Sequence, residues 1–390
     1  MQPNSTAFFL KYRKKLIPFN PVINNIKYLT MFRIEMLPAE YGDCLWIEYG
    51  KPNGKTHRVL IDGGLAGCGK ILRKRINALD PDDRHFDLVV VTHIDTDHIN
   101  GIINLLKNMP EGFCFDYFWF NGYDQIKPQG VLGVPQGIEL TDLLLKLEKK
   151  ENRKFWNKPF RRKAVMLPAS GIPKKVKLKG GMKMTILGPT VKGITVLYKE
   201  WDRVVREALS DKGKETPPVS EAENLFTPRE LEEISVEELA REGFIEDDSP
   251  SNGSSIVLLA EYDGQKILLT GDAFPGDIVE GVSRLAAPQE KINLNAVKLP
   301  HHGSKNNNSN ALFEAFSCRN FMVSTNGRKH GHPDRQGIAR ILVNNAGGST
   351  LYFNYSHEGN KIWTNPELQQ DYRYNAIYAD NGNLKITLKE

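Results

Sequence analysis

The chain has 390 residues, of which 40% are hydrophobic and 25% charged, ordinary values for a soluble globular protein. Its four cysteines, at positions 44, 68, 114 and 318, are widely spaced. This spacing excludes a cysteine-rich zinc module and a disulfide scaffold, and it favours a reducing compartment. No apolar run approaches the ~20 residues of a membrane span, and the apolar run at 8–10 is too short for a signal peptide. We therefore expect a cytoplasmic protein without a membrane partner.

The first thirty residues differ from the rest of the chain in charge. They hold five basic residues and no acid, and because the whole chain is also +5, residues 31–390 sum to zero. They also lack clear periodicity, so we interpret 1–30 as an extension before one main domain at 31–390, with Met31 as an alternative start. The segment suits either a basic arm for nucleic acid or a loosely packed leader, and the leader is favoured.

Three strands are predicted at the start of the main domain. FRIEM and CLWIEY alternate and form a hairpin that bends near Gly42 and Asp43, and HRVLIDGG follows as the third strand. Asp62 ends that strand. It suits either a carboxylate that orients a ligand histidine or a simple Asp-Gly turn.

The stretch VVVTHIDTDHINGI, at 89–102, is the most informative in the chain. Its β-branched residues predict a buried strand, and the following apolar spacing predicts a helix. Between them stand two imidazoles and two carboxylates, His93, Asp95, Asp97 and His98. So many ligand types in six positions favour a metal site. The alternative is a polar loop in which Asp97 caps a helix that begins at His98.

Further elements are predicted from periodicity alone. The apolar spacing indicates helices at 68–80 and 139–156, a strand at 115–120, and paired strands at 164–171 and 182–190.

Two neighbouring segments carry opposite charge. Residues 146–183 hold fourteen bases and two acids, a net of +12, and residues 200–248 hold sixteen acids and six bases, a net of −10. We expect a charged insertion at about 191–250, with helices at 199–210 and 228–242. The basic segment, which includes Phe155, Trp156 and Phe160, suits phosphates and stacked bases; equally, the two segments could pair with each other.

The second half repeats the pattern of polar residues at strand ends. IVLLAEY and KILLTG form a hairpin over Asp263-Gly264 that ends at Asp272, and a helix is expected at 278–285. AVKLP leads to His301, His302 and Ser304, and NFMVSTNG leads to His330 and His332. A strand at 350–355 and a closing hairpin at 374–388 complete the prediction. An aspartate that ends an apolar strand requires a partner to offset its desolvation, and a metal ion is a natural one.

The ordered motifs LIDGG, HxDxDHxxG, TGDA, HHGS and GHP resemble the metallo-β-lactamase fold superfamily. Within it, the chain is most similar to the hydrolase domain of ComEC-type competence DNA-uptake proteins and their stand-alone relatives, from about Met31 to about Tyr355. The channel helices of those proteins have no counterpart here. The resemblance implies an α/β fold, a four-layer αββα sandwich with metal at the strand ends.

The resemblance also implies a ligand set. His93 and Asp95 would serve one metal position, and Asp97, His98 and either His301 or His302 the other, with Asp272 bridging. The chain departs from the family in two ways: residues 99–300 contain no histidine, and Asp95 stands where histidine is commoner. We therefore expect one firm metal and one weaker position, rich in oxygen and favouring Mn²⁺ or Fe²⁺ over Zn²⁺.

These features predict a metal-dependent hydrolase that activates water. It would most readily act as a phosphodiesterase or nuclease on nucleic acid or a nucleotide-like ester. Asp95 or Asp97 would hold the attacking water, and His332, Ser304 and the spare histidine would donate to substrate oxygens or the leaving group. Two alternatives remain: hydrolysis of another ester, amide or lactone, and a non-catalytic subunit that binds a protein partner through 200–248.

Overall fold

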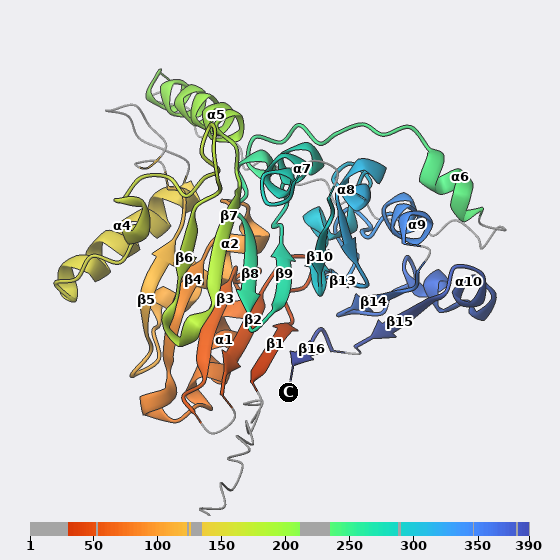
Figure 1. Ribbon diagram of the computed structural model, residues 1–390. Helices are drawn as coiled ribbons and strands as arrows, with labels where there is room; N and C mark the ends of the chain where they lie inside the picture. The colour runs from red at the N-terminus through yellow and green to blue at the C-terminus, as the bar shows by residue number, and fades with distance from the viewer. Residues whose placement is uncertain are drawn as a thin grey trace, which may run out of the picture.

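Two β-sheets lie face to face in the computed structural model of the chain (Figure 1), which describes residues 30–389 except 52–53, 123–124, 126–134, 211–234, 288–289, 346 and 380. The six-stranded sheet has the order β16 (Leu384–Lys389), β1 (Met31–Met36), β2 (Leu45–Gly50), β3 (His57–Ile61), β4 (His85–Val90) and β5 (Cys114–Trp119). The eight-stranded sheet has the order β15 (Tyr374–Tyr378), β14 (Ser349–Phe353), β13 (Asn320–Val323), β11 (Ala296–Lys298), β9 (Gln265–Leu269), β8 (Val257–Tyr262), β7 (Lys183–Gly188) and β6 (Lys175–Lys177). A small parallel pair joins β10 (Ile292–Leu294) to β12 (Phe316–Cys318).

The alternation of buried side chains explains why the sheets stack. In β2, Leu45, Ile47 and Tyr49 belong to the core between the sheets, whereas Trp46 belongs to the core on the outer face. In β8, Leu258 and Ala260 likewise face the other sheet. Because side chains alternate along a strand, each sheet is apolar on both faces and requires cover on both.

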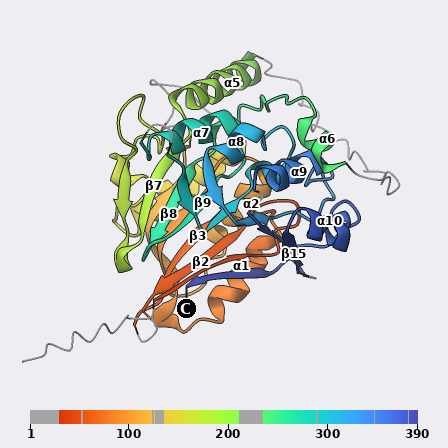
Figure 2. The ribbon, with the colours of Figure 1, turned by 45° about the vertical axis from the view of Figure 1, so that its right-hand side comes forward.

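Helices supply the outer cover of each sheet (Figure 2). The outer core of the six-stranded sheet includes side chains of α1 (Cys68–Asn77), α2 (Thr96–Lys107) and α4 (Pro135–Lys150). That of the eight-stranded sheet includes side chains of α6 (Val236–Arg241), α7 (Pro275–Ser283), α8 (Asn310–Glu314) and α9 (Arg335–Asn344), with α10 (Pro366–Asp371) beside β15. The predicted four-layer αββα sandwich is thus confirmed.

The segment predicted as a charged insertion begins with α5 (Val191–Ser210), whose Ile194, Leu197 and Trp201 form a separate small core with Ile94. The helix starts eight residues before the predicted 199. Of the predicted helix at 228–242, residues 228–234 lie outside the described part of the chain, and α6 covers six of the rest. Residues 1–29, most of the predicted basic extension, are also outside it.

Two strand predictions are wrong. Residues 164–171 are not a strand, because the polar groups of Val165 bond to the Asn121 side-chain amide, and β7 pairs instead with β6. The closing hairpin does not form either. β15 pairs with β14 in one sheet and β16 pairs with β1 in the other, so the chain crosses between the sheets after Tyr378.

Two more helix boundaries differ from the prediction. The helix predicted at 139–156 ends at Lys150, because Phe155 and Trp156 turn back into the core under the capping carboxylate of Glu148. The helix predicted at 278–285 begins at Pro275. In the described part of the chain, no helix combines the length and the hydropathy required to cross a membrane.

The aromatic residues of the basic segment belong to the core. Phe155, Trp156 and Phe160 are buried, so the prediction that they interleave with bases on a surface strip is wrong. Several bases of this segment pair with nearby acids that lie outside 200–248: Arg162 with Glu148, Lys179 with Asp116, and Lys175 with Glu261.

Candidate metal centre

The candidate site lies beyond the carboxyl ends of the parallel strands β3, β4, β9 and β11. His93 and Asp95 lie in the loop after β4, and Asp97 and His98 lie in the first turn of α2, which starts at Thr96. The alternative in which Asp97 caps a helix from His98 is therefore wrong. Neither Asp97 nor Asp95 makes a side-chain cap, and Asp95 accepts a 2.5 Å hydrogen bond from the Ser251 hydroxyl.

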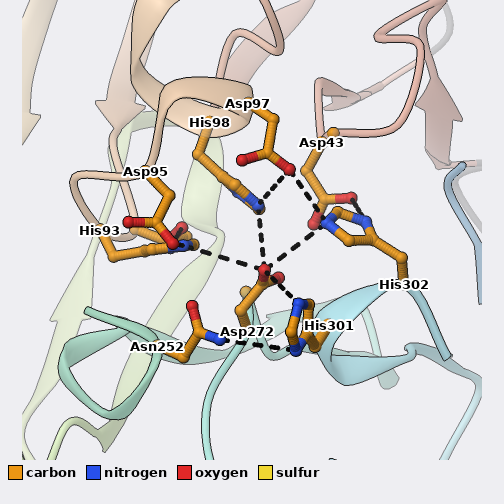
Figure 3. Close-up of polar contacts among 12 residues, drawn as sticks. Asp43, His93, Asp95, Asp97, His98, Asn252, Asp272, His301 and His302 are labelled. Atoms are coloured by element: carbon orange, nitrogen blue, oxygen red, sulfur yellow. Dashed lines mark hydrogen bonds and ion pairs between the residues drawn. The ribbon is translucent and has the colours of Figure 1, made fainter. Parts of the chain in front are cut away.

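Asp272 stands at the centre of the site (Figure 3). Its Oδ2 lies 3.3 Å from Nε2 of His98, 3.5 Å from Nε2 of His302 and 3.8 Å from Nε2 of His93. Asp272 is 2% exposed, so its charge is removed from water. Side chains from both halves of the chain therefore converge on one carboxylate, as the strand ends predicted.

The two adjacent histidines occupy different positions. Both have left-handed backbones, with φ of 47° at His301 and 55° at His302, which is strained for a residue with a Cβ. His302 Nε2 lies 3.4 Å from Asp97 Oδ2 and so belongs with Asp97 and His98. His301 Nε2 lies 4.0 Å from Asp272, and its Nδ1 faces Asn307 Oδ1 at 2.9 Å.

Asp62 orients two of the imidazoles. Its Oδ2 faces His98 Nδ1 at 2.9 Å and accepts a 2.7 Å hydrogen bond from the Thr92 hydroxyl. That hydroxyl has a single proton, so at its 3.0 Å contact with His93 Nδ1 it must accept. Both histidines therefore carry a proton on Nδ1 and turn Nε2 towards Asp272, which is the orienting role anticipated for Asp62.

A buried ion pair behind His302 was not identified from the sequence. Asp43, at the bend of the β1–β2 hairpin, pairs with Lys298 of β11, and its Oδ1 lies 3.3 Å from His302 Nδ1. The two side chains are 1% and 0% exposed. The only signal was a lysine within the otherwise apolar run AVKLP, because a lysine is almost never fully buried without a partner.

A second missed group holds His301. Asp247 Oδ2 accepts hydrogen bonds from Asn252 Nδ2 at 2.7 Å and Asn307 Nδ2 at 3.0 Å, and lies 3.5 Å from His301 Nδ1. These residues come from the end of the predicted insertion and from the NNN run after HHGS. Their polar residue types gave no period or spacing by which to recognise them.

Two residues predicted to act on substrate lie in different surroundings. His332 packs edge-on against His301, with ring centroids 5.1 Å apart, and its Nδ1 lies 3.4 Å from Asp334. It therefore borders the site. Ser304 does not point into it: its buried hydroxyl accepts a hydrogen bond from the backbone of Asn306 and stabilises the turn.

The electrostatics of the centre are strongly coupled. Burial alone would raise the pKa of Asp272, but the charges of His98, His302 and His301 lower it well below its usual range. Burial would likewise lower the pKa of His98, yet the carboxylates of Asp272 and Asp62 raise it well above its usual value. The carboxylates therefore stabilise positive charge at this point of the structure.

The donor set fits a divalent metal ion. Nε2 of His93, His98 and His302 and Oδ1 of Asp272 are buried and make no hydrogen bond, which is costly unless another group satisfies them. Two overlapping triads have donor atoms within 4.8 Å of one another: His93, His98 and Asp272, and Asp97, His98 and His302. Imidazole and carboxylate donors suit Zn²⁺, Mn²⁺ or Fe²⁺.

Comparison with known proteins agrees with this fold. Residues 37–109 match the family model described as the metallo-beta-lactamase superfamily. This range includes the bend of the β1–β2 hairpin, Asp62 and the HxDxDH motif. No curated protein matches the chain.

Several solved structures align with most of this chain at low similarity. The metallo-beta-lactamase fold protein YhfI from Bacillus subtilis aligns over 91% of this chain and 99% of its own, with 11% identity and a TM-score of 0.39. Zn(2+)-bound PqqB from Methylobacterium extorquens aligns over 91% and 99%, with 11% identity and a TM-score of 0.35. CmlA, a diiron β-hydroxylase from Streptomyces venezuelae, aligns over 92% of this chain but 54% of its own, so this chain spans about half of CmlA, with 11% identity and a TM-score of 0.39. The matched region, residues 37–109, and the αββα sandwich are thus similar to the metallo-β-lactamase superfamily.

Proposed function

We propose that this protein is a metal-dependent phosphodiesterase that acts on nucleic acid or a nucleotide-like ester. One observation carries the metal dependence: three buried imidazoles turn unpartnered Nε2 atoms towards a single buried carboxylate, Asp272. Within a folded protein, such an arrangement without a cation would leave several polar atoms unsatisfied. Bound metal ions would satisfy these atoms.

The contacts support a particular division of ligands. Asp97, His98, His302 and Asp272 would hold the firmer ion, since all four are buried or nearly so and lie within one triad or beside it. His93, Asp95 and Asp272 would hold a weaker one, because Asp95 is 40% exposed in its side chain. His301 is then the spare histidine of the pair.

The residues of the chain have separate tasks in the proposed reaction. When bound, a divalent ion lowers the pKa of water to about 7 and neutralises charge on phosphate oxygens. Asp95, held by Ser251 and open to solvent, would orient the attacking water and take up its proton at a carboxylate oxygen. His301, fixed through Nδ1, would present Nε2 to the leaving group, with His332 beside it.

Three features favour phosphate over other substrates. The centre is rich in oxygen donors, with Asp95, Asp97 and Asp272 in place of a full histidine set, which suits hard ions and anionic substrates. The motif order also resembles ComEC-type hydrolase domains. In addition, the basic segment 146–183 has a net charge of +12 and would attract phosphate groups. Because its aromatic residues are buried, we propose phosphate contact there without base stacking.

A substrate panel tests the proposal. The chain should hydrolyse bis(4-nitrophenyl) phosphate with added Mn²⁺ and less well with Zn²⁺, and Asp272→Ala and Asp97→Ala should abolish hydrolysis. Asp82→Asn, an exposed carboxylate remote from the centre, serves as the matched control and should retain activity. Hydrolysis of a lactone or carboxylic ester but of no phosphodiester would contradict the proposal.

The cellular compartment of the protein is also a proposal. The four cysteines lie in the described part of the chain and are free thiols, three of them buried, which supports a reducing compartment such as the cytoplasm. Single-stranded DNA binding that weakens steeply with salt would support phosphate contact by the basic segment 146–183. DNA binding that is independent of salt would exclude this contact.

A further inference from the structure

A second group of metal-ligand side chains lies at the opposite end of the six-stranded sheet. His57 and His85 are the first residues of β3 and β4, and Asp87 and Asp116 follow in β4 and β5. These strands are parallel, so their starts share one end of the sandwich, whereas the candidate centre lies beyond their carboxyl ends. At about 3.3 Å per residue, the length of β4 alone separates the two groups by roughly 16 Å.

Asp87 is the buried member of this group. Its side chain is 1% exposed, and its Oδ2 contacts His57 Nδ1 at 2.8 Å and the Tyr49 hydroxyl. Its Oδ1 is buried and makes no hydrogen bond; His85 Nδ1 lies 3.7 Å away. A carboxylate oxygen taken out of water without a partner is costly, so this atom indicates a missing ligand.

His85 connects Asp87 to Asp116. Its Nε2 lies 3.1 Å from Asp116 Oδ1, so the imidazole stands between two carboxylates. One donor atom from each of His85, Asp87 and Asp116 lies within 4.8 Å of the others. Zinc bonds of about 2.0–2.2 Å place tetrahedral ligands roughly 3.4 Å apart, so these side chains would have to rotate towards a bound ion.

The surroundings of this group give an ion access from solvent and also contain a competing ammonium group. The side chains of His85 and Asp116 are 17% and 22% exposed, so an ion could enter from solvent. Lys179, from the turn between β6 and β7, places its ammonium 2.9 Å from Asp116, and its side chain is 64% exposed. The same turn packs on His57, because a Cβ at Gly180 would lie 2.4 Å from that ring.

We propose that His85, Asp87 and Asp116 form a structural Zn²⁺ site that is separate from the hydrolytic centre. His57 would orient Asp87 through its Nδ1, and a water would complete the coordination. Zinc binding would displace the Lys179 ammonium from Asp116. The ion would join the starts of β4 and β5. This site does not depend on the proposed hydrolase activity.

Cobalt and zinc titrations of the full chain test the site. They are performed in an Asp272→Ala background, so that the hydrolytic centre contributes little. We expect one Co²⁺ to give a visible d–d absorption band, Zn²⁺ to displace it, and the His85 ring resonances to shift in NMR spectra. His85→Gln should abolish the band, and Asp116→Asn should weaken binding at least tenfold.

Lys179→Ala distinguishes a metal site from a simple ion-pair network. Removing the competing ammonium should strengthen Zn²⁺ binding, whereas Lys177→Ala, an exposed neighbour, should leave it unchanged. Zn²⁺ should also raise the thermal midpoint of the Asp272→Ala chain but not that of Asp272→Ala/His85→Gln. The proposal is overturned if titration detects no ion that depends on His85, or if Asp116→Asn and Asp82→Asn behave alike.

Discussion

Replacing Gly42 with alanine should disturb the candidate centre without replacing any of the proposed ligands. A Cβ at position 42 would lie 1.8 Å from the carbonyl oxygen of Asp97, whereas ordinary contact begins at 3.4 Å. The adjacent backbone is tied to the same atom, since the Asp43 amide donates to the Asp97 carbonyl at 3.2 Å. The hairpin bend and the first turn of α2 must therefore separate by about 1.6 Å.

That displacement sets the expected magnitude. A misplacement of about 1 Å costs on the order of 10²-fold in rate, and overpacking costs about 1–3 kcal/mol of stability. We expect Gly42→Ala to remain folded, to bind Mn²⁺ more weakly, and to lose at least 10²-fold in phosphodiester hydrolysis. Gly67→Ala is the matched control, because the nearest atom to its Cβ would be 3.8 Å away.

Calorimetric Mn²⁺ titration and initial rates on bis(4-nitrophenyl) phosphate, with circular dichroism to confirm folding, provide the assay. If folded Gly42→Ala binds Mn²⁺ and turns over substrate as the Gly67→Ala protein does, the close packing of the hairpin on α2 does not position the ligands, and the reasoning fails.

Two further predictions concern stability. Asp43→Asn leaves the Lys298 ammonium buried without its carboxylate, so urea denaturation should show a loss of about 3–5 kcal/mol, most of it restored in Asp43→Asn/Lys298→Met; equal stability of the single and double variants would contradict this. Asp277 has a pKa raised to about 6, chiefly by burial and then by the neighbouring acids Glu280 and Glu246. The folded state therefore binds this proton more tightly than the unfolded state, and stability is lost as pH rises from about 4 to 6. Asp277→Asn should be more stable than wild type by about 1–3 kcal/mol at pH 7.5 and equal to it at pH 4, whereas a difference that is constant across pH would refute the assignment.

The candidate ligands could be predicted because the ends of buried strands can be recognised from the local sequence. Runs such as VVV and KILL mark buried strands, and polar residues that follow them must lie at a sheet edge. Asp97, His98, Asp272 and His302 were all identified in this way, and the structure brings them together. The sequence could not separate His301 from His302, since the choice depends on two left-handed residues in succession.

Non-local pairing explains most of the errors. Asn381-Gly382 is a strong hairpin signal, but β16 finds its partner in β1, more than 300 residues earlier, and a local pattern cannot report that contact. The run at 164–171 is apolar at its start, which predicted a strand, yet the side-chain amide of Asn121 bonds to the backbone of Val165 in place of a neighbouring strand. The role of Asp43 could not be predicted from the sequence for the same reason, because only the fold places it beside Lys298 and His302.

The central claim is that Asp272 and the surrounding imidazoles bind a catalytic divalent ion. The most direct measurement is an anomalous difference map from crystals of the chain soaked in Mn²⁺. We predict a strong peak within bonding distance of Asp272, His98 and His302 that disappears in Asp272→Ala crystals. A map from fully soaked wild-type crystals without density at that point would contradict the account.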